Sequence, residues 1–465
     1  MINFDQIEKY RENNRIEAKR ALGGLPKSLW ETYSAFANTF GGIILLGVEE
    51  LTDKTLCTVN LPEPEKLIAE FWDIINDRER VNSNILTKED VMIHKIGNNR
   101  IIGITVPRAD RRNRPVYIGS NPYLGSYRRD GEGDYHCTEE EVRSMLRDRE
   151  ERALDEKTLP HLTLETLDQE TVRRYRTYLK DGYPGYAWEQ YDDQEVLCGI
   201  GACRQTEDGQ LHPTAAGLLM FGFEDEIVKE YPYYYLDYQE RERDGSMRER
   251  LISNSGKWSG NLFDFYLRIS GKIVRGLPYD IHRAVREAAA NCMMNGDYMG
   301  SGGIVIIKKK DEISITNPGS FRMDIQEAVN GGKPDPRNVL TARLFHLVKV
   351  GARKGKGVPN IYAVWEKKGW KKPRISERLQ PDRITLKLPL AENGGAKEEM
   401  NGVEERPEYR DAVIDYVTRR VCINGAETEK LLGVGAEEAG LLLKQMEAAG
   451  ILCAAEAKKT YYLKI

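Results

Sequence analysis

The chain has 465 residues, and its 69 basic and 73 acidic side chains give a net charge of −4. This length predicts two to four domains, and the acidic balance argues against a protein that coats nucleic acid through overall positive charge. No apolar run approaches the roughly 18 residues of a membrane span, and the seven dispersed cysteines favour buried thiols over a disulfide framework or a zinc site. We expect a cytoplasmic protein with no membrane partner.

Residues 1–152 form the first predicted domain. Glu17 and Lys19 lie two apart, so on the expected strand they share one face. A helix follows, then a turn at Gly41-Gly42, and the apolar run Ile43–Val48 predicts a buried strand. This strand delivers two acids to its carboxyl end, Glu49 and Glu50.

Arginines interleaved with tyrosines are concentrated between residues 108 and 129. Guanidinium groups bind phosphates and tyrosine rings stack on bases, so this composition is typical of a nucleic-acid surface. A solvated loop with ordinary surface charge is the alternative. The residues expected to contact DNA or RNA are Lys19, Arg111, Arg112, Arg114, Arg128 and Arg129.

Two further regions follow the first domain. Residues 153–244 are expected to be a connector and middle region, with a helix over Gln169–Leu179. Residues 245–392 alternate helical and strand patterns, including a helix over Asp280–Cys292 and a hairpin around Lys310-Asp311. The chain is therefore predicted to be a multidomain α/β (α+β) protein.

The end of the chain is expected to be a separate small domain. Residues 393–407 are polar, acidic and glycine-bearing, which is the composition of a linker. Residues 408–465 predict three helices and a terminal strand pair, the pattern of a winged helix. Such domains read DNA or mediate dimerisation. Because the third helix is acidic, a protein interaction is favoured, and a homodimer is one expected assembly.

The first domain resembles the Schlafen AlbA-like domain of bacterial proteins once described as RecG-related helicases or transcriptional regulators. The resemblance implies a nucleic-acid-binding function. It rests on Glu17-Ala-Lys19, Ser34–Thr39, Gly41-Gly42, Gly47–Glu50, Gly125–Gly131 and Thr138–Glu141.

The same resemblance implies a possible catalytic group. Schlafen-type nucleases use a glutamate, a second glutamate five residues later, and an acid after the glycine-glycine strand. Glu12, Glu17 and either Glu49 or Glu50 have these places. Three converging carboxylates would hold Mg²⁺ or Mn²⁺, with Glu12 and Glu17 as ligands, and would support cleavage of a phosphodiester. In the structural alternative, Glu17 pairs with Lys19 or an arginine.

Residues 245–392 resemble the ATPase domain of the gyrase and histidine-kinase (GHKL) superfamily, which implies a two-layer α/β fold. Glu287 would polarise water and Asn291 would bind Mg²⁺ from one helical face. The adenine-reading loop would start at Asn317, where the usual aspartate is missing, so the implied ATP binding is weak. The residues expected to bind nucleotide are Glu287, Asn291, Asn317, Gly319, Gly351, Gly355 and Gly357.

Three functions stay open on the sequence. The preferred one is a nucleic-acid-binding regulator with a weak ATP-binding module. The alternatives are a metal-dependent nuclease acting on RNA or DNA, and a scaffold that keeps both folds without activity. The enzyme class is therefore open between an ATPase and an endonuclease, but the lack of a Walker A sequence excludes a P-loop helicase.

Overall fold

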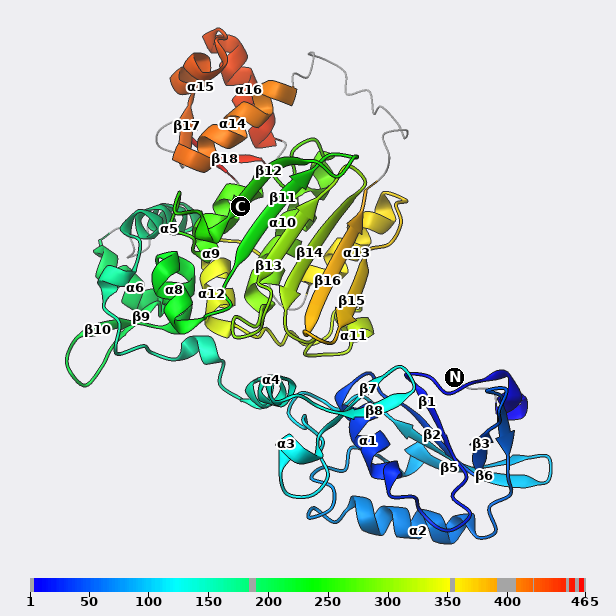
Figure 1. Ribbon diagram of the computed structural model, residues 1–465. Helices are drawn as coiled ribbons and strands as arrows, with labels where there is room; N and C mark the ends of the chain where they lie inside the picture. Colours follow the sequence, from blue (N-terminus) through cyan, green and yellow to red (C-terminus); the bar gives the residue numbers. More distant parts are fainter. Residues whose placement is uncertain are drawn as a thin grey trace. The chain divides into compact units, whose positions relative to one another are not determined.

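The computed structural model describes residues 4–183, 190–351, 356–390, 407–420, 422–448, 451–455 and 460–463, which Figure 1 colours along the sequence. The chain divides into two compact units, Met1–Glu151 and Arg152–Ile465, close to the boundary predicted at residue 152. Helices and sheets are mixed in both units, so the predicted multidomain α/β (α+β) class is confirmed. Within the described ranges, no helix is long and apolar enough to cross a membrane.

The first unit is built on a four-stranded sheet in the order β1-β2-β6-β5. β1 (Ile16–Lys19) is parallel to β2 (Gly42–Leu46), whereas β6 (Asn99–Val106) is antiparallel to both β2 and β5 (Val91–Ile96). Because parallel strands need a crossover connection, α1 (Ser28–Asn38) joins β1 to β2. The strand–helix–strand order predicted for this stretch is confirmed.

Both faces of this sheet are covered, because β2 alternates its side chains between two apolar clusters. Ile44 and Leu46 belong to the cluster that includes α1 and α2 (Pro64–Ile75). Leu45 packs on the opposite face with Ile7 of η1 (Phe4–Lys9). The continuous apolar run in the sequence therefore reflects a strand buried on two sides.

Shorter elements complete the first unit. β3 (Val48–Glu50) pairs with β4 (Leu56–Thr58), and the hairpin of β7 (Tyr127–Asp130) and β8 (Gly133–His136) lies beside α1. Buried Asn38, the last residue of α1, donates to the carbonyl oxygens of Val116 (2.8 Å) and Tyr127 (3.0 Å). The remaining elements are η2 (Lys88–Asp90), α3 (Pro122–Gly125) and α4 (Glu139–Arg149).

The second unit contains a six-stranded sheet in the order β12-β11-β13-β14-β16-β15. Only β11 and β13 are parallel neighbours; the other pairs are antiparallel, including the predicted β13–β14 hairpin. The strands are β11 (Leu236–Arg241), β12 (Met247–Ile252), β13 (Ile304–Lys308), β14 (Glu312–Pro318), β15 (Arg374–Arg378) and β16 (Arg383–Pro389).

Helices cover one face of this sheet and form a second layer (Figure 1). They are α9 (Leu262–Ser270), α10 (His282–Asn295), α12 (Val339–Leu347) and α13 (Gly357–Lys367). The short helix η6 (Ser253–Ser255) precedes α9, and the short helices η7 (Tyr279–Ile281) and α11 (Ile325–Val329) come between the longer ones.

The predicted boundary at residues 244 and 245 is wrong, because it separates β11 from β12 in one continuous sheet. The region before it also shares the apolar core of the sheet and its helices. This region consists of η3 (Leu154–Glu156), η4 (Leu164–Thr166), α5 (Gln169–Gly182), α6 (Asp193–Ile200), β9 (Cys203–Gln205), β10 (Leu211–Pro213), α7 (Ala215–Phe221) and α8 (Glu224–Glu230).

The tail has its own small core around Val413, Val417 and Leu443. The three predicted helices are present, and a short strand, β17, precedes the second of them and pairs with β19. The predicted linker, 393–407, lies outside the described residues except for its last position. The elements are α14 (Pro407–Arg420), β17 (Cys422–Asn424), α15 (Gly425–Leu432), α16 (Ala436–Ala448), β18 (Leu452–Ala455) and β19 (Thr460–Leu463).

Candidate nucleic-acid interface and nucleotide cavity

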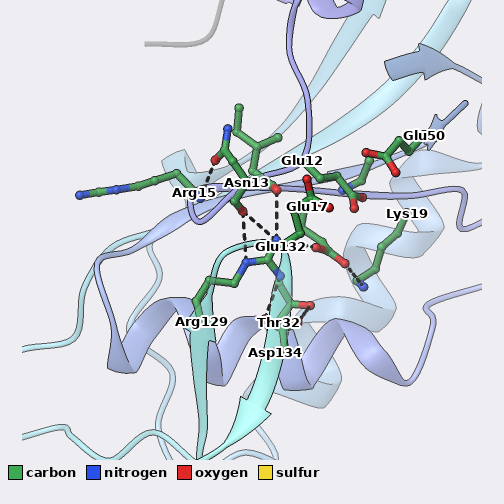
Figure 2. Close-up of polar contacts among 12 residues, drawn as sticks. Glu12, Asn13, Arg15, Glu17, Lys19, Thr32, Glu50, Arg129, Glu132 and Asp134 are labelled. Carbon is green, nitrogen blue, oxygen red and sulfur yellow. Dashed lines mark hydrogen bonds and ion pairs between the residues drawn. The ribbon is translucent and has the colours of Figure 1, made fainter. Parts of the chain in front are cut away.

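Glu17 lies between two cations of the first unit (Figure 2). Its Oε1 is 2.8 Å from Lys19 Nζ, as expected for residues on one face of β1, and its Oε2 is 2.9 Å from Arg129 Nη2. The Arg129 side chain is only 1% exposed and also pairs with Asp134 at 2.9 Å. Glu17 therefore serves as a counter-ion to an arginine that is buried in the fold.

Glu49 and Glu50 have different partners because successive residues of β3 point to opposite faces. Glu49 Oε2 is 3.0 Å from Arg20 Nε. Glu50 Oε2 is 3.0 Å from Lys54 Nζ, and its charge acts on Glu12. Of the two acids that the sequence left open, Glu50 is the one on the side of Glu12 and Glu17 (Figure 2).

Glu12 completes this carboxylate group. Its Oε1 accepts the Ala18 N–H at 3.0 Å. Burial raises the pKa of Glu12, and the nearby charges of Glu17 and Glu50 raise it further. In the part of the chain that the structure describes, however, no three His, Cys, Asp or Glu side chains are grouped to hold a metal ion. Because both oxygens of Glu17 are paired with Lys19 and Arg129, the three carboxylates Glu12, Glu17 and Glu50 do not fit the metal centre that the resemblance implied.

Three of the arginines expected to contact nucleic acid are buried instead, which corrects the predicted surface. Arg111 is 6% exposed, and its Nη1 donates to the carbonyl oxygens of Asp148 (2.6 Å) and Glu150 (3.2 Å) at the end of α4. Arg114 is 3% exposed, and Arg129 is held as described above. These three arginines therefore lie inside the unit and are not part of an exposed surface.

The other three expected contacts also differ from one another. Arg128 lies over the Tyr135 ring at 5.6 Å and pairs with Glu141 at 3.3 Å, so its charge is largely balanced. Lys19 is turned towards Glu17. Arg112 is exposed and is the one member of the predicted set that faces solvent.

A different group of cations lies at one end of the sheet. Arg15 precedes β1, Phe40 precedes β2 by two residues, and Arg108 follows β6 by two residues; the strand register brings these positions together. The guanidinium carbons of Arg15 and Arg108 lie 5.7 and 5.9 Å from the centre of the Phe40 ring. We call Arg15, Phe40 and Arg108 the Phe40 cluster.

Glycine at position 41 permits this close packing. Gly41 has a φ of +73°, and a Cβ there would lie 2.7 Å from the Val106 carbonyl oxygen and 2.9 Å from the Arg108 nitrogen. Arg15 Nη1 donates to the Phe40 carbonyl oxygen at 2.5 Å, while Arg15 as a whole is exposed. Sequence reasoning missed this cluster because its members are 25 and 68 positions apart; the available signal was an arginine flanking each of two paired strand ends.

The second unit contains a cavity of about 550 Å³ between the sheet and its helices. Asn291, Asn317 and Gly357, three of the residues predicted to bind nucleotide, line it. Glu287 lies beside the cavity: a Cβ on Gly357 would be 2.8 Å from both Glu287 Oε1 and Asn291 Nδ2. Asn360 Nδ2 also lies 3.4 Å from Glu287 Oε2. α10 therefore presents these two polar side chains to the start of α13.

The remaining predicted nucleotide residues lie around this region. Gly319 has a φ of +101° and packs against the Arg337 guanidinium, while a Cβ on Gly351 would be 2.9 Å from Met294 Cε of α10. Gly355 lies outside the described residues. Asn317 is 5% exposed, and its Nδ2 donates to the Pro318 carbonyl oxygen at 3.0 Å. The cavity thus has the Asn317 carboxamide at the position where the sequence already indicated that the usual aspartate is missing.

Comparisons with known families match three parts of the chain. Residues 12–138 match "Schlafen, AlbA_2". Residues 302–387, from just before β13 to within β16, match "Putative ATP-dependent DNA helicase recG C-terminal". Residues 143–237 match a "Domain of unknown function (DUF8451)". No curated protein matches the chain.

We describe two of the solved structures that are similar to this chain. One is the DIP2311 protein from Corynebacterium diphtheriae, with 18% identity over 97% of this chain and 92% of that one, and a TM-score of 0.41. The other is the N-terminal domain of a RecG-related protein from Nitrosomonas europaea, with 30% identity over 29% of this chain and 90% of that one, and a TM-score of 0.23.

Proposed function

Because the chain is a Schlafen AlbA-like, RecG-related protein, we propose that it is a nucleic-acid-binding regulatory protein whose first unit binds DNA or RNA at the Phe40 cluster. The observation that carries this proposal is the pair of guanidinium groups that flank one aromatic ring at a sheet end. Guanidinium groups bind phosphates in a forked geometry and stack on bases. The exposed Arg112 follows Arg108 closely in the chain and adds a further cation.

A small number of cations implies a shallow salt dependence. Each phosphate contact changes the slope of log affinity against log salt by about 0.7 to 0.9. With contacts from Arg15, Arg108 and Arg112, the slope should be about −2 to −3, about half of what six arginines and lysines would give. Binding through few phosphate contacts suits a regulator that recognises a short site better than it suits a protein that coats long nucleic acids.

The test is a salt titration of binding with labelled single-stranded and duplex oligonucleotides of DNA and RNA. The double variant Arg15→Ala, Arg108→Ala should weaken binding at least tenfold. It should also make the slope of log affinity against log salt shallower, by the amount that about two phosphate contacts contribute. Lys95→Ala, Arg100→Ala is the matched control, because these cations lie at the opposite end of β6. If both variants bound equally well, the Phe40 cluster would not be the interface.

The cavity of the second unit supports a weak ATP-binding module. In this proposal Asn291 of α10, which lines the cavity, would contact the metal–phosphate group of the nucleotide, and Glu287 is next to it. Asn317 offers one carbonyl oxygen to a base amino group but no negative charge, and the loss of a charged hydrogen bond costs about 1–3 kcal/mol, or about ten- to a hundredfold in affinity. Calorimetry with ATP and Mg²⁺ should show weak binding that Asn291→Ala abolishes; binding unaffected by that variant would place the nucleotide elsewhere.

The tail supports a role in assembly. Its order of helix, strand, two helices and a strand pair supports the predicted winged helix. The exposed side of α16 carries Glu437 and Glu438, which would repel phosphates. We therefore propose that this domain contacts protein, with a second copy of the chain as the first partner to test by sedimentation.

A further inference from the structure

The dispersed cysteines of the sequence predict buried thiols, and two of them in the second unit, buried Cys203 and half-buried Cys198, lie side by side. Cys198 is on the last turns of α6, and Cys203 is the first residue of β9. Their Sγ atoms are 3.0 Å apart. This contact is independent of the Phe40 cluster and of the cavity contacts used above.

The turn between the two cysteines fixes this contact. α6 ends at Gly201, which has a φ of 87°, a conformation that glycine adopts without steric cost. The Gly201 N–H donates to the Cys198 carbonyl oxygen at 3.0 Å, and the Ala202 N–H donates to that of Leu197 at 2.8 Å. These bonds reverse the chain directly after α6 and bring Cys203 next to Cys198.

Neighbouring elements hold the turn in place. Thr214 Oγ1 donates to the Gly201 carbonyl oxygen at 3.0 Å, and the Thr214 N–H donates to that of Ala202 at 2.9 Å. Cys203 pairs with Pro213 in the β9–β10 ladder. Because the backbone on both sides is fixed, the two thiols are held together without a further loss of chain entropy, which favours reaction between them.

We propose that Cys198 and Cys203 form a redox modification site, in which a hydroperoxide converts the dithiol into an intramolecular disulfide. In the first step, the Cys198 sulfur attacks the peroxide; it becomes a sulfenic acid, and hydrogen peroxide leaves as water. In the second step, the Cys203 sulfur attacks the Cys198 sulfur and displaces hydroxide, which takes the Cys203 proton and leaves as a second water. Two thiols are thereby oxidised and one peroxide is reduced.

The surroundings of the two thiols assign these roles. Cys198 is half-buried and open to a small oxidant, whereas Cys203 is 1% exposed. Burial and the adjacent Cys198 raise the pKa of Cys203 well above its usual value, so Cys203 is a poor first nucleophile. Cys198 reacts with the oxidant, and Cys203 reacts only with Cys198.

The experiment is peptide mass spectrometry on the reduced full-length protein after treatment with hydrogen peroxide and then N-ethylmaleimide. Both cysteines lie in the tryptic peptide 181–204. We expect this peptide to lose two hydrogen atoms, to carry no maleimide at either cysteine, and to regain both thiols with dithiothreitol. Exposed Cys57 reports that the oxidant and the alkylating reagent are active.

Dimedone, which traps sulfenic acids, tests the order of the steps. Cys203→Ser should accumulate a dimedone adduct at Cys198, and the wild type should not. Two results with the wild type would overturn the proposal, provided that Cys57 is oxidised in the same sample. One is that both thiols are kept, and the other is a dimedone adduct at Cys198 as the final product. The measurement on the wild type decides the question even where a serine variant fails to fold.

Discussion

Glu17 illustrates how one side chain can hold two cations of the fold at the same time. Its two oxygens hold Lys19 and the buried Arg129. We expect Glu17→Gln to lower the free energy of unfolding by about 1–3 kcal/mol, because Arg129 would lose one of its two carboxylate partners without gaining solvent. Urea denaturation measures this difference.

The control for that prediction is Glu49→Gln. Glu49 lies next to Glu50 in β3, and its ion pair does not involve a buried cation. Its partner Arg20 has a side chain that is 63% exposed, and such surface pairs contribute about 0–1 kcal/mol. Equal losses in the two variants would contradict the view that Glu17 is a structural counter-ion.

Glu12 predicts a pH dependence. Its pKa is raised first by burial and then by Glu17 and Glu50, while the Ala18 N–H opposes the shift. The folded state therefore takes up a proton more readily than the unfolded chain, so this group favours folding at low pH and opposes it as the pH rises through the raised pKa. Glu12→Gln, which keeps an oxygen for the Ala18 N–H, should raise the free energy of unfolding at pH 7.

The same comparison at about pH 4, near the ordinary pKa of glutamate, should show a smaller benefit from Glu12→Gln, because the native side chain is then largely protonated. Glu89→Gln, on an exposed acid, is the control and should change stability little at either pH. A benefit of equal size at both pH values would show that the Glu12 charge is not the cause.

At the level of elements, the close approach of α13 to α10 at Gly357 leads to a prediction about ATP binding in the cavity. Ala at position 357 would place a Cβ 2.8 Å from Asn291 Nδ2 and Glu287 Oε1. Both atoms end movable side chains, so Gly357→Ala should displace them without unfolding the protein. We expect a loss of ATP affinity of about tenfold, or about 1.4 kcal/mol, by calorimetry.

Gly182→Ala is the matched control, because a Cβ there would meet no atom closer than 3.5 Å. It should leave the ATP affinity unchanged. If Gly357→Ala also left the affinity unchanged, Asn291 and Glu287 would not contact the nucleotide.

The sequence was sufficient to predict elements that have a strong apolar pattern bounded by glycines or polar turns. It was insufficient where contacts between distant residues determine the boundaries and the burial. The β1–α1–β2 unit could be predicted from an apolar run and its glycines, and the β13–β14 hairpin from two apolar runs and a polar turn. The boundary at 245 could not, because β12 belongs to its sheet only through pairing with β11. Likewise, composition alone cannot show that Arg111 and Arg114 are buried, since an arginine that binds a carbonyl oxygen and one that binds a phosphate have the same local sequence.

For the whole molecule, separate apolar cores in the two units predict separate unfolding events. A calorimetric scan should show more than one transition. An oligonucleotide at about a hundred times its dissociation constant should stabilise one transition by about 2.7 kcal/mol. The variant Arg15→Ala, Arg108→Ala should remove this shift, and a shift of every transition by the oligonucleotide would contradict binding confined to the first unit.

The internal pairing of so many cations also has a consequence for kinetics. The charges of Arg128, Arg129 and Lys19 are neutralised by ion pairs with neighbouring acids. The first unit therefore projects little positive electrostatic potential into solvent. Encounter with nucleic acid should then be unsteered, with an association rate constant in the ordinary range of about 10⁵–10⁷ M⁻¹s⁻¹. Differences between preferred and other oligonucleotides should lie in how long each complex lasts, which would let a protein with the proposed function leave wrong sites quickly.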